Sequence, residues 1–266
     1  MFDALKAIDE VIYLSISGRD DEMWDIIRRF NKEKSKAVFE RCLELSQSDN
    51  FYKQRAAANI LGTLGCYGGE YPHQKECIPY LENLLASYNE RVLEAAISAL
   101  GQLNGVEAIL NNLRLIKHSS AFIRLSMAQC LGTLDSSNAR RALIQLSSDN
   151  NIDVRNWATF GLGTQCDNNT KKIRAALFAR LDDADEETRN EAILGLARRK
   201  IRDVIPHLVR ELKFQPCNPS PLALEAAHEL LASEFLAPLR VIKEEYGDPC
   251  GSVSDTIAAI ESITLE

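Results

Sequence analysis

Small and large apolar residues recur along the middle of this chain at the spacings of an amphipathic helix. Each copy of the pattern ends in a Leu followed by a small residue, and the copies return every 31 to 39 residues. Spacings of three and four residues place side chains on one helix face, where alanines let a neighbouring helix approach closely and leucines fill the gaps. The pattern therefore predicts one core helix per copy, with a small or flexible residue and a Leu on its buried stripe: Ala57 and Leu61, Ala96 and Leu100, Met127 and Leu131, Ala158 and Leu162, Ala192 and Leu196.

A second amphipathic segment follows each core helix. These segments cover residues 77–85, 108–116, 139–146, 173–181 and 204–212. Helix pairs that repeat at this period predict an all-α fold, an α-solenoid of antiparallel helix pairs. In such a stack each repeat contacts mainly its neighbours, and binding of another macromolecule is the default expectation.

The loops before two of the core helices are rich in acidic residues. They cover residues 149–153 and 183–187, and carboxylates at a helix start cap free amide groups and meet the positive end of the helix dipole. Arg155 and Arg189 stand six residues after the first Asp of each loop. We expect them to pair with acidic loop residues of adjacent repeats and to set the repeat spacing.

The repeats resemble HEAT repeats of the short bacterial kind first associated with phycobilisome lyases. The shared features are an acidic turn, the Val154-Arg155 pair, an Ala-rich helix that ends in Leu-Gly, and a shorter second helix. The match is strongest over 149–212, fair over 52–146 and weak elsewhere, and Gln54 and Leu93 replace the usual Arg. The resemblance implies a HEAT-like or armadillo-type superhelix. It does not imply bilin attachment, because the name of the subtype refers to the repeat sequence and not to the activity.

The repeats and their flanks predict a single α-solenoid domain over residues 1–266. Residues 1–50 show helical periodicity without the repeat signature and are predicted to form an N-terminal helical cap. Residues 51–214 hold the HEAT-like repeats, and residues 215–266 are predicted to hold degenerate repeats and a C-terminal cap. Terminal repeats of a stack are expected to differ because one of their faces must meet water.

Composition favours a chain that works in the cytoplasm. No stretch has the length and apolarity of a membrane span, and residues 1–6 lack the pattern of a secretory signal. The seven cysteines include no Cys-x-x-Cys pair, so we expect reduced, buried thiols in place of a disulfide framework.

The formal net charge of −7 bears on the partner. Nucleic-acid binding would need a basic groove to neutralise phosphates, and the basic clusters at 171–172 and 198–200 sit among a surplus of acids. We therefore expect no nucleic acid, no membrane and a basic protein partner.

The candidate catalytic and metal sites are all weak, so neither an enzyme nor a bound cofactor is predicted. HEAT proteins that bind iron use several His-Glu pairs, whereas this chain has only His228-Glu229. Cys66, His73 and Cys77 share one connection, but their spacing matches no compact zinc motif and a fourth ligand is missing. His118 and His207 have no recognised nucleophile beside them.

A partner-binding face is predicted beside the core stripe, where Trp157 replaces small side chains and the flanking positions run from aromatic to acidic. Large aromatic residues dominate contact energies at interfaces. The alternatives are that Trp157 packs across the seam between repeats and that the acidic residues form only a solvated turn. The predicted partner-binding residues are Tyr52, Phe122, Asp153, Trp157, Asp185, Glu187 and Glu191.

Three functions from different classes fit this sequence. The first is a non-catalytic protein-binding solenoid; bacterial HEAT stacks of this kind include immunity proteins, and an acidic inhibitor suits a toxin with a basic nucleic-acid cleft. The second is a HEAT-like lyase or maturation factor acting on a cofactor or protein, which predicts a concave pocket with converging polar groups. The third is a scaffold subunit of a larger assembly, which predicts several partners.

Overall fold

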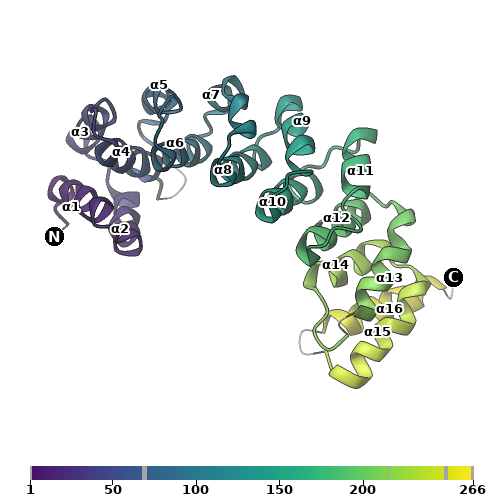
Figure 1. Ribbon diagram of the computed structural model, residues 1–266. Coiled ribbons are helices and arrows are strands. Elements are labelled where there is room, and N and C mark those ends of the chain that lie inside the picture. The colour runs from purple at the N-terminus through teal and green to yellow at the C-terminus, as the bar shows by residue number, and fades with distance from the viewer. Residues whose placement is uncertain (1, 68–70, 215, 249–250, 265–266) are drawn as a thin grey trace. The chain divides into compact units, whose positions relative to one another are not determined.

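The computed structural model describes residues 2–67, 71–214, 216–248 and 251–264. Over these ranges the regular structure consists of α-helices and short 3-10 or π-helical turns, without a strand, which confirms the predicted all-α solenoid fold (Figure 1). None of the described helices has the length and apolarity needed to cross a bilayer. The chain divides into two compact units, Met1–Leu134 and Asp135–Glu266.

The N-terminal unit is built from helix pairs that follow one another in sequence order (Figure 1). The first helices of its repeats pack side by side, and the second helices form another layer behind them. The row of first helices is α4 (Phe51–Thr63), α6 (Glu90–Gln102) and α8 (Ala121–Gly132); the second layer is α3 (Lys36–Ser46), α5 (Gln74–Leu84) and α7 (Val106–Asn111), which the 3-10 turn η2 (Leu113–Lys117) extends.

The segment predicted as an N-terminal cap contains three helices. α1 (Ala4–Ile16) and α2 (Asp20–Ile27) pack on α4, and the 3-10 turn η1 (Arg28–Lys32) leads into α3. The buried Arg55 guanidinium of α4 joins Asp20 of α2 at 2.9 Å, and Arg91 of α6 reaches the same carboxylate at 3.1 Å. α3 itself contacts α4 and α5, so it continues the second layer, while α1 and α2 cover the end of the row.

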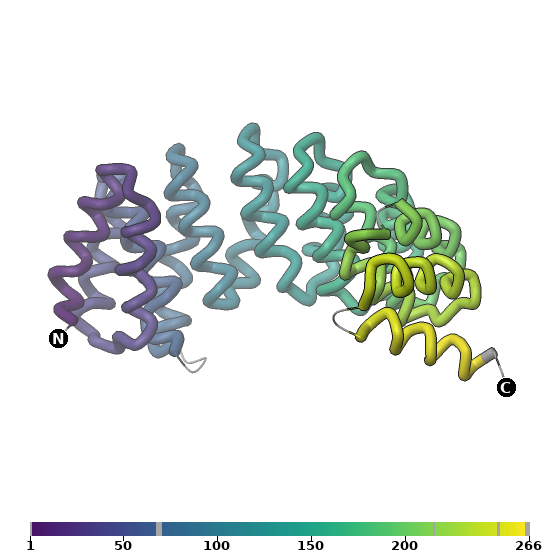
Figure 2. The backbone as a smooth tube through the Cα atoms, turned by 90° about the horizontal axis from the view of Figure 1, so that it is seen from below, coloured from purple at the N-terminus to yellow at the C-terminus, as the bar shows by residue number. Residues whose placement is uncertain are grey.

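The C-terminal unit repeats the same two layers (Figures 1 and 2). α12 packs between α10 and α14 in the row of first helices, and α16 packs on α14 and α15. The row is α10 (Ile152–Gly163), α12 (Glu186–Arg198) and α14 (Pro221–Leu230); the second layer is α9 (Ser137–Leu146), α11 (Lys171–Phe178) and α13 (Ile205–Phe214) after the turn η3 (Arg202–Val204); then follow η4 (Ser233–Phe235), α15 (Leu236–Val241), its π-helical continuation η5 (Ile242–Tyr246) and α16 (Ser252–Thr264).

The predicted buried stripe is confirmed in every copy. The small or flexible residue of each copy is fully buried, and the Leu four positions later is at most 1% exposed. Burying a Leu side chain stabilises the fold by roughly 1.5–3 kcal/mol, so each Leu of the stripe contributes to the stacking of the repeats. Its members are Ala57, Ala96, Met127, Ala158 and Ala192, with Leu61, Leu100, Leu131, Leu162 and Leu196.

The backbones of α10 and α12 touch near their carboxyl ends. A Cβ atom built on Gly195 would lie 2.5 Å from the Gly163 Cα, and one built on Gly163 would lie 2.9 Å from the Glu191 carbonyl oxygen. Both distances are far shorter than van der Waals contact. Only glycine at these two positions allows so close an approach.

Arg199 stabilises this contact between α10 and α12. Its half-buried guanidinium donates hydrogen bonds to the carbonyls of Leu162 at 2.7 Å, Gly163 at 3.0 Å and Gly195 at 2.6 Å. It also reaches the carbonyls of Cys166 and Asn168 in the connection after α10. A helix end leaves carbonyls without intrahelical partners, and a cation placed there also meets the negative end of the dipole. Burial lowers the pKa of Arg199. Cys166 and Asp167, in the connection after α10, oppose this shift.

One position of the repeat has a structural role that the sequence analysis missed. It is held by Gln54, Leu93, Arg124, Arg155 and Arg189 in successive repeats. Except at Leu93, which has no donor group, the side chain at this position donates to the carbonyl six residues earlier and thereby closes the loop that precedes its own helix. The bonds run from Gln54 to Ser48, from Arg124 to His118, from Arg155 to Asp149 and from Arg189 to Asp183, at 2.8 to 2.9 Å.

The predicted pairing across repeats is confirmed for Arg155 and wrong for Arg189. Arg155 makes a two-pronged ion pair with Asp183 in the loop before α12, with N–O distances of 3.0 and 2.9 Å. Arg189 instead pairs with Glu211 of α13 at 3.0 Å, because the loop that follows α13 is rich in proline and holds no acidic residue between 216 and 220.

The capping prediction holds for one of the two acidic loops. Asp185 caps α12, since its carboxylate accepts hydrogen bonds from the Thr188 amide at 2.8 Å and hydroxyl at 2.7 Å. The α10 helix is capped by Asn151, which accepts from the Val154 amide at 3.1 Å. The acidic Asp149 stands two residues before Asn151 and accepts a hydrogen bond from its amide.

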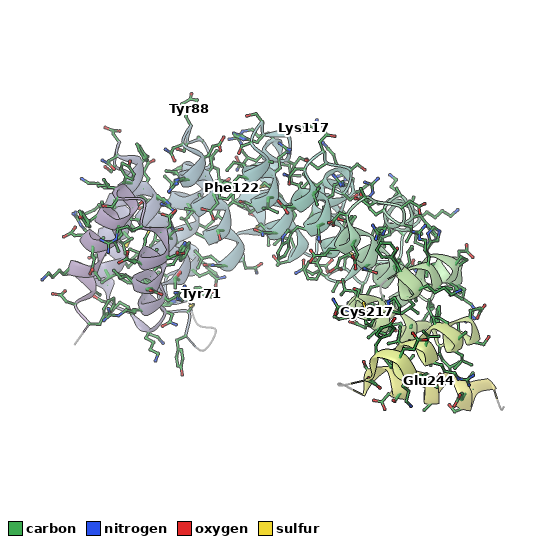
Figure 3. The ribbon with its side chains drawn as sticks, turned by 60° about the horizontal axis from the view of Figure 1, so that its bottom comes forward. Tyr71, Tyr88, Lys117, Phe122, Cys217 and Glu244 are labelled. Carbon is green, nitrogen blue, oxygen red and sulfur yellow. The ribbon has the colours of Figure 1, made fainter. Side chains whose placement is uncertain are left out.

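The cysteines are less uniformly buried than predicted. Cys42, Cys77 and Cys130 are buried free thiols, as expected. Cys217, which Figure 3 labels in the loop before α14, is exposed because that proline-rich loop packs into neither layer. Cys66 and Cys166 are half-buried, and Cys250 lies outside the described residues.

The backbone contact yields a first prediction. In Gly195→Ala the new methyl group overlaps the α10 backbone, so the helices must separate and the free energy of unfolding should fall by about 1–3 kcal/mol. Urea unfolding followed by circular dichroism measures this loss. The control is Gly101→Ala, whose methyl meets the Cys130 Sγ at 3.1 Å, a side-chain atom that can turn away. Equal losses in the two variants would contradict a backbone contact at Gly195.

The Arg155–Asp183 pair yields a second prediction. Burial alone would raise the pKa of Asp183, but the hydrogen bonds from Arg155 and the Asp185 amide outweigh it, and the net pKa lies below its usual value. A lowered carboxyl pKa stabilises the fold at neutral pH, and this contribution is lost as pH falls through the pKa of the folded state. Asp183→Asn should therefore cost about 3 kcal/mol at pH 7.

The pH dependence of that cost is the sharper test. The difference in unfolding free energy between Asp183→Asn and the parent protein should shrink as the pH is lowered below about 4. Urea titrations at pH 7, 5 and 3 measure it. A difference that stays constant over this range would show that the Asp183 charge is not what stabilises the loop.

Candidate partner-binding groove

The seven residues predicted to bind a partner are split between the two units. Tyr52 and Phe122 lie in the N-terminal unit, on α4 and α8, with α6 between those helices. Tyr52 is half-buried against the ring of Phe51, with 4.0 Å between centroids, and Phe122 is 48% exposed (Figure 3). The structure does not bring these two aromatic residues together. Their role in binding stays a prediction.

Three of the five residues in the C-terminal unit line one cavity. Trp157 of α10 faces Glu187 and Glu191 of α12 across a groove of about 480 Å³. The groove, called the Trp157 groove below, is completed by Asn156, Phe160, Ser220, Pro221 and Leu222.

The other two predicted residues stand apart from this groove. Asp153 is exposed in the first turn of α10, one helical turn before Trp157, and does not line the cavity. The carboxylate of Asp185 is occupied by Thr188 as the cap of α12. A substitution at Asp185 would therefore disturb the helix start as well as the surface charge.

The aromatic wall of the groove consists of two rings from one helix. Trp157 and Phe160 meet edge to face, with 5.5 Å between their centroids. Trp157 nevertheless keeps 40% of its surface exposed, although a large aromatic side chain gains free energy from burial. Phe160 was not predicted; its signal is its position three residues after Trp157, which places both rings on one helix face.

The acidic wall consists of two carboxylates one helical turn apart on α12. Glu187 is exposed at the rim and accepts a hydrogen bond from the Asn156 amide at 2.8 Å. Glu191 is only 9% exposed, and its Oε2 accepts from the Thr164 hydroxyl at 3.1 Å. Burial raises the pKa of Glu191, and the negative charges of Glu187 and Glu225 add to this shift, against the Thr164 hydrogen bond and the charge of Arg198.

No cation of the described chain forms an ion pair with Glu191. Arg198, whose charge it feels, donates instead to Glu225 of α14 at 2.6 Å and to the Thr164 carbonyl at 3.2 Å. Buried charges in proteins are normally paired, because removal from water is costly without a partner. Glu191 is thus a desolvated carboxylate that opens onto a cavity.

The candidate metal ligands are occupied by protein groups. His228 shares a hydrogen bond of 3.3 Å with the Thr256 hydroxyl, and Glu229 accepts from the Lys200 ammonium at 2.7 Å. His73 bonds to Glu76 at 2.7 Å and stacks on a phenylalanine ring. Within the described ranges, no group of three or more His, Cys, Asp or Glu side chains is placed to hold a metal ion.

A second cavity of about 670 Å³ lies in the C-terminal unit, between α14, η5 and α16. Its wall includes the apolar side chains of Leu224, Ile242 and Val253, the hydrogen-bonded pair His228 and Thr256, and further polar residues such as Asn218, Glu225 and Asp255. Asp248 also lines it, but that carboxylate accepts from the backbone amides of residues 253 and 254 at the start of α16. The lining of this cavity is therefore mainly apolar, with polar groups at several points.

Comparison with known proteins bears on the family and the fold. The chain matches the family model of HEAT repeats over residues 40–132 and 140–213. Protein YibA of Escherichia coli strain K12 is 33% identical over 129 residues, 48% of this chain and 45% of that protein, and the O157:H7 protein matches equally. In these alignments the chain spans about half the length of the curated relatives it matches.

The chain is also similar to solved structures. The X-ray structure of Escherichia coli YibA superposes with a TM-score of 0.77 at 23% identity, over 97% of this chain and 95% of that one. An engineered protein superposes with a TM-score of 0.57 at 16% identity, over 96% of this chain and 77% of that one. At these identities the likeness supports the fold alone.

The desolvated carboxylate yields a third prediction. A raised carboxyl pKa means that the ionised group opposes folding, and this cost disappears as the pH falls and Glu191 takes up a proton. Glu191→Gln keeps the shape and can still accept from Thr164, so it should raise the urea midpoint at pH 7. At pH 4 the gain should be smaller. A lowered midpoint at pH 7 would show that the Glu191 charge supports the fold.

Proposed function

Because this chain belongs to the HEAT-repeat family, we propose that it is a non-catalytic protein-binding solenoid whose contact surface includes the Trp157 groove. Stacked helix pairs present broad surfaces to other macromolecules. The observation that carries the proposal is the meeting of an exposed tryptophan with a desolvated carboxylate in one cavity. Both features cost the isolated protein free energy, and a partner that covers the groove would recover it.

We further propose that the partner is a basic toxin domain and that this chain acts as its immunity protein in the cytoplasm. The net charge of −7 favours encounter with a positively charged partner, and acidic groups on a wall of the groove meet cations at short range. A nuclease-like toxin carries a basic cleft for phosphates. Glu187 and Glu191 would compete with phosphates for that cleft.

A second candidate is supported by the apolar cavity at the C-terminal end. A maturation factor or lyase needs a concave site for its cofactor or substrate, and the cavity of about 670 Å³ is large enough to hold a small molecule. Several of its polar groups are already bonded within the protein: His228 to Thr256, Glu225 to Arg198, and Asp248 to the backbone at the start of α16. The protein-binding function is therefore better supported.

The fourth prediction concerns capture of the partner. Trp157→Ala removes the exposed ring and Glu187→Lys reverses the rim charge, so each should reduce capture at least tenfold, because truncation of an interface tryptophan costs 2 kcal/mol or more. Affinity capture from native cells with mass spectrometry measures this. Asp185 is left unchanged because it caps α12. Far-UV circular dichroism should be the same for all variants.

The matched control for the ring is Tyr88→Ala. Tyr88 lies in the N-terminal unit, is fully exposed and projects away from the helices (Figure 3). Capture should survive this change. Equal capture by the parent and Trp157→Ala proteins would exclude the groove as the contact surface.

The same preparation separates the three functions. An immunity protein should capture one partner and restore growth of cells that express the toxin encoded beside it. A scaffold should capture several proteins at fixed ratios and restore no growth. A maturation factor should carry a small molecule, visible by native mass spectrometry, that Leu224→Arg removes from the apolar cavity.

A further inference from the structure

We propose that the Trp157 groove is a socket for a single arginine side chain of the partner, with Glu191 as the carboxylate that receives the guanidinium. This inference rests on the proposed function and names the group that the groove takes. It follows from the hydrogen bonds and ion pairs that the groove side chains make within the protein and from the bonding capacity that they leave unused.

The first step is the free bonding capacity of Glu191. Its Oε2 accepts one hydrogen bond, from Thr164, and its Oε1 has no hydrogen-bond donor among the described residues. An ionised carboxylate can accept about four hydrogen bonds. A residue 9% exposed keeps little contact with water, so donors on a group that enters the groove would complete its shell.

The second step is the charge around that site. Glu187 lies one turn away on the same wall, and Glu225 of α14 is near enough to raise the pKa of Glu191. Arg198 is the cation that opposes them, but its guanidinium is turned to Glu225 and the Thr164 carbonyl. The groove therefore keeps a negative balance that one additional positive charge would offset.

The third step is the shape of the cation. A guanidinium is planar, stacks on aromatic rings and donates two parallel hydrogen bonds to a carboxylate. The groove offers both surfaces, with Trp157 and Phe160 on α10 opposite Glu191 on α12. A lysine ammonium would also be attracted by the negative charge, but it could not donate two parallel hydrogen bonds to the carboxylate. Arginine therefore fits better than lysine.

The test uses the full chain and a short probe, acetyl-Gly-Arg-Gly-amide. The indole N–H signal of Trp157 is followed by NMR, with the signal of Trp24 in the N-terminal unit as an internal reference. The probe should shift Trp157 in a saturable way, with a Kd of about 1 mM for one side chain. The citrulline peptide has the same shape without the charge and should bind at least tenfold more weakly, and the lysine peptide should lie between them.

Glu191→Gln is the informative variant because it is expected to fold at least as well as the parent. It should weaken the arginine probe at least tenfold. Glu94→Gln is its matched control: Glu94 is a half-buried carboxylate of α6, in a cavity of the N-terminal unit without aromatic residues, and burial raises its pKa too. That variant should bind the probe as the parent does.

The outcomes separate the socket from the proposed function. Equal shifts with arginine and citrulline peptides, or unchanged binding by Glu191→Gln, would overturn the socket. If in that case Trp157→Ala still loses the native partner, the protein-binding function stands without it. If the probe binds as expected while Trp157→Ala captures the partner fully, the groove takes an arginine side chain but is excluded as the contact surface of that partner.

Discussion

The C-terminal unit depends on one contact in which two helix backbones meet with no side chain between them. Gly163 and Gly195 bring the carboxyl ends of α10 and α12 together, and the Arg199 guanidinium ties the carbonyls of both helices. An arginine that serves backbone carbonyls gains several charge-assisted hydrogen bonds where the helix would otherwise end with unpaired oxygens. The distance between the two helices is thereby set by contact between backbone atoms and by the Arg199 hydrogen bonds more than by the packing of side chains.

Glu191 lies directly beside this backbone contact. Its own carbonyl lies against Gly163, so its side chain begins beside the tightest part of the contact. Trp157 stands six residues before Gly163 on α10, and there side chains of α10, α12 and the start of α14 line the Trp157 groove. The tight backbone contact and the open groove thus lie one to two turns apart on the same helix pair. Stability and binding capacity come from neighbouring parts of one helix pair.

The periodic features of this chain could be predicted from its sequence, and the contacts between elements could not. The buried stripe and the helix pairs follow from spacing alone, because a helix places residues three and four apart on one face. The partner of Arg189 depends on which element comes next, and a proline-rich loop left Glu211 as the nearest acid. Trp157 was recognisable as an oversized residue at a small-residue position, whereas its cavity depends on α14, whose position no spacing revealed. Asp185 carried two predictions, a helix cap and a contact surface: the structure confirms the cap, and the contact stays a prediction.

The cysteines of this protein differ in their access to reagents in solution. Burial raises the pKa of Cys77 and of Cys130, each to about 12, and Cys42 is buried as completely, so none of the three offers a reactive thiolate in the folded N-terminal unit. Cys217 is exposed in the C-terminal unit. An alkylating reagent would therefore mark Cys217 at once and the three buried sulfurs only when their helices part. The delay between alkylation of Cys217 and alkylation of the three buried cysteines would therefore report the rate at which the N-terminal unit opens. The native cysteines serve as the reporters, so no residue has to be introduced.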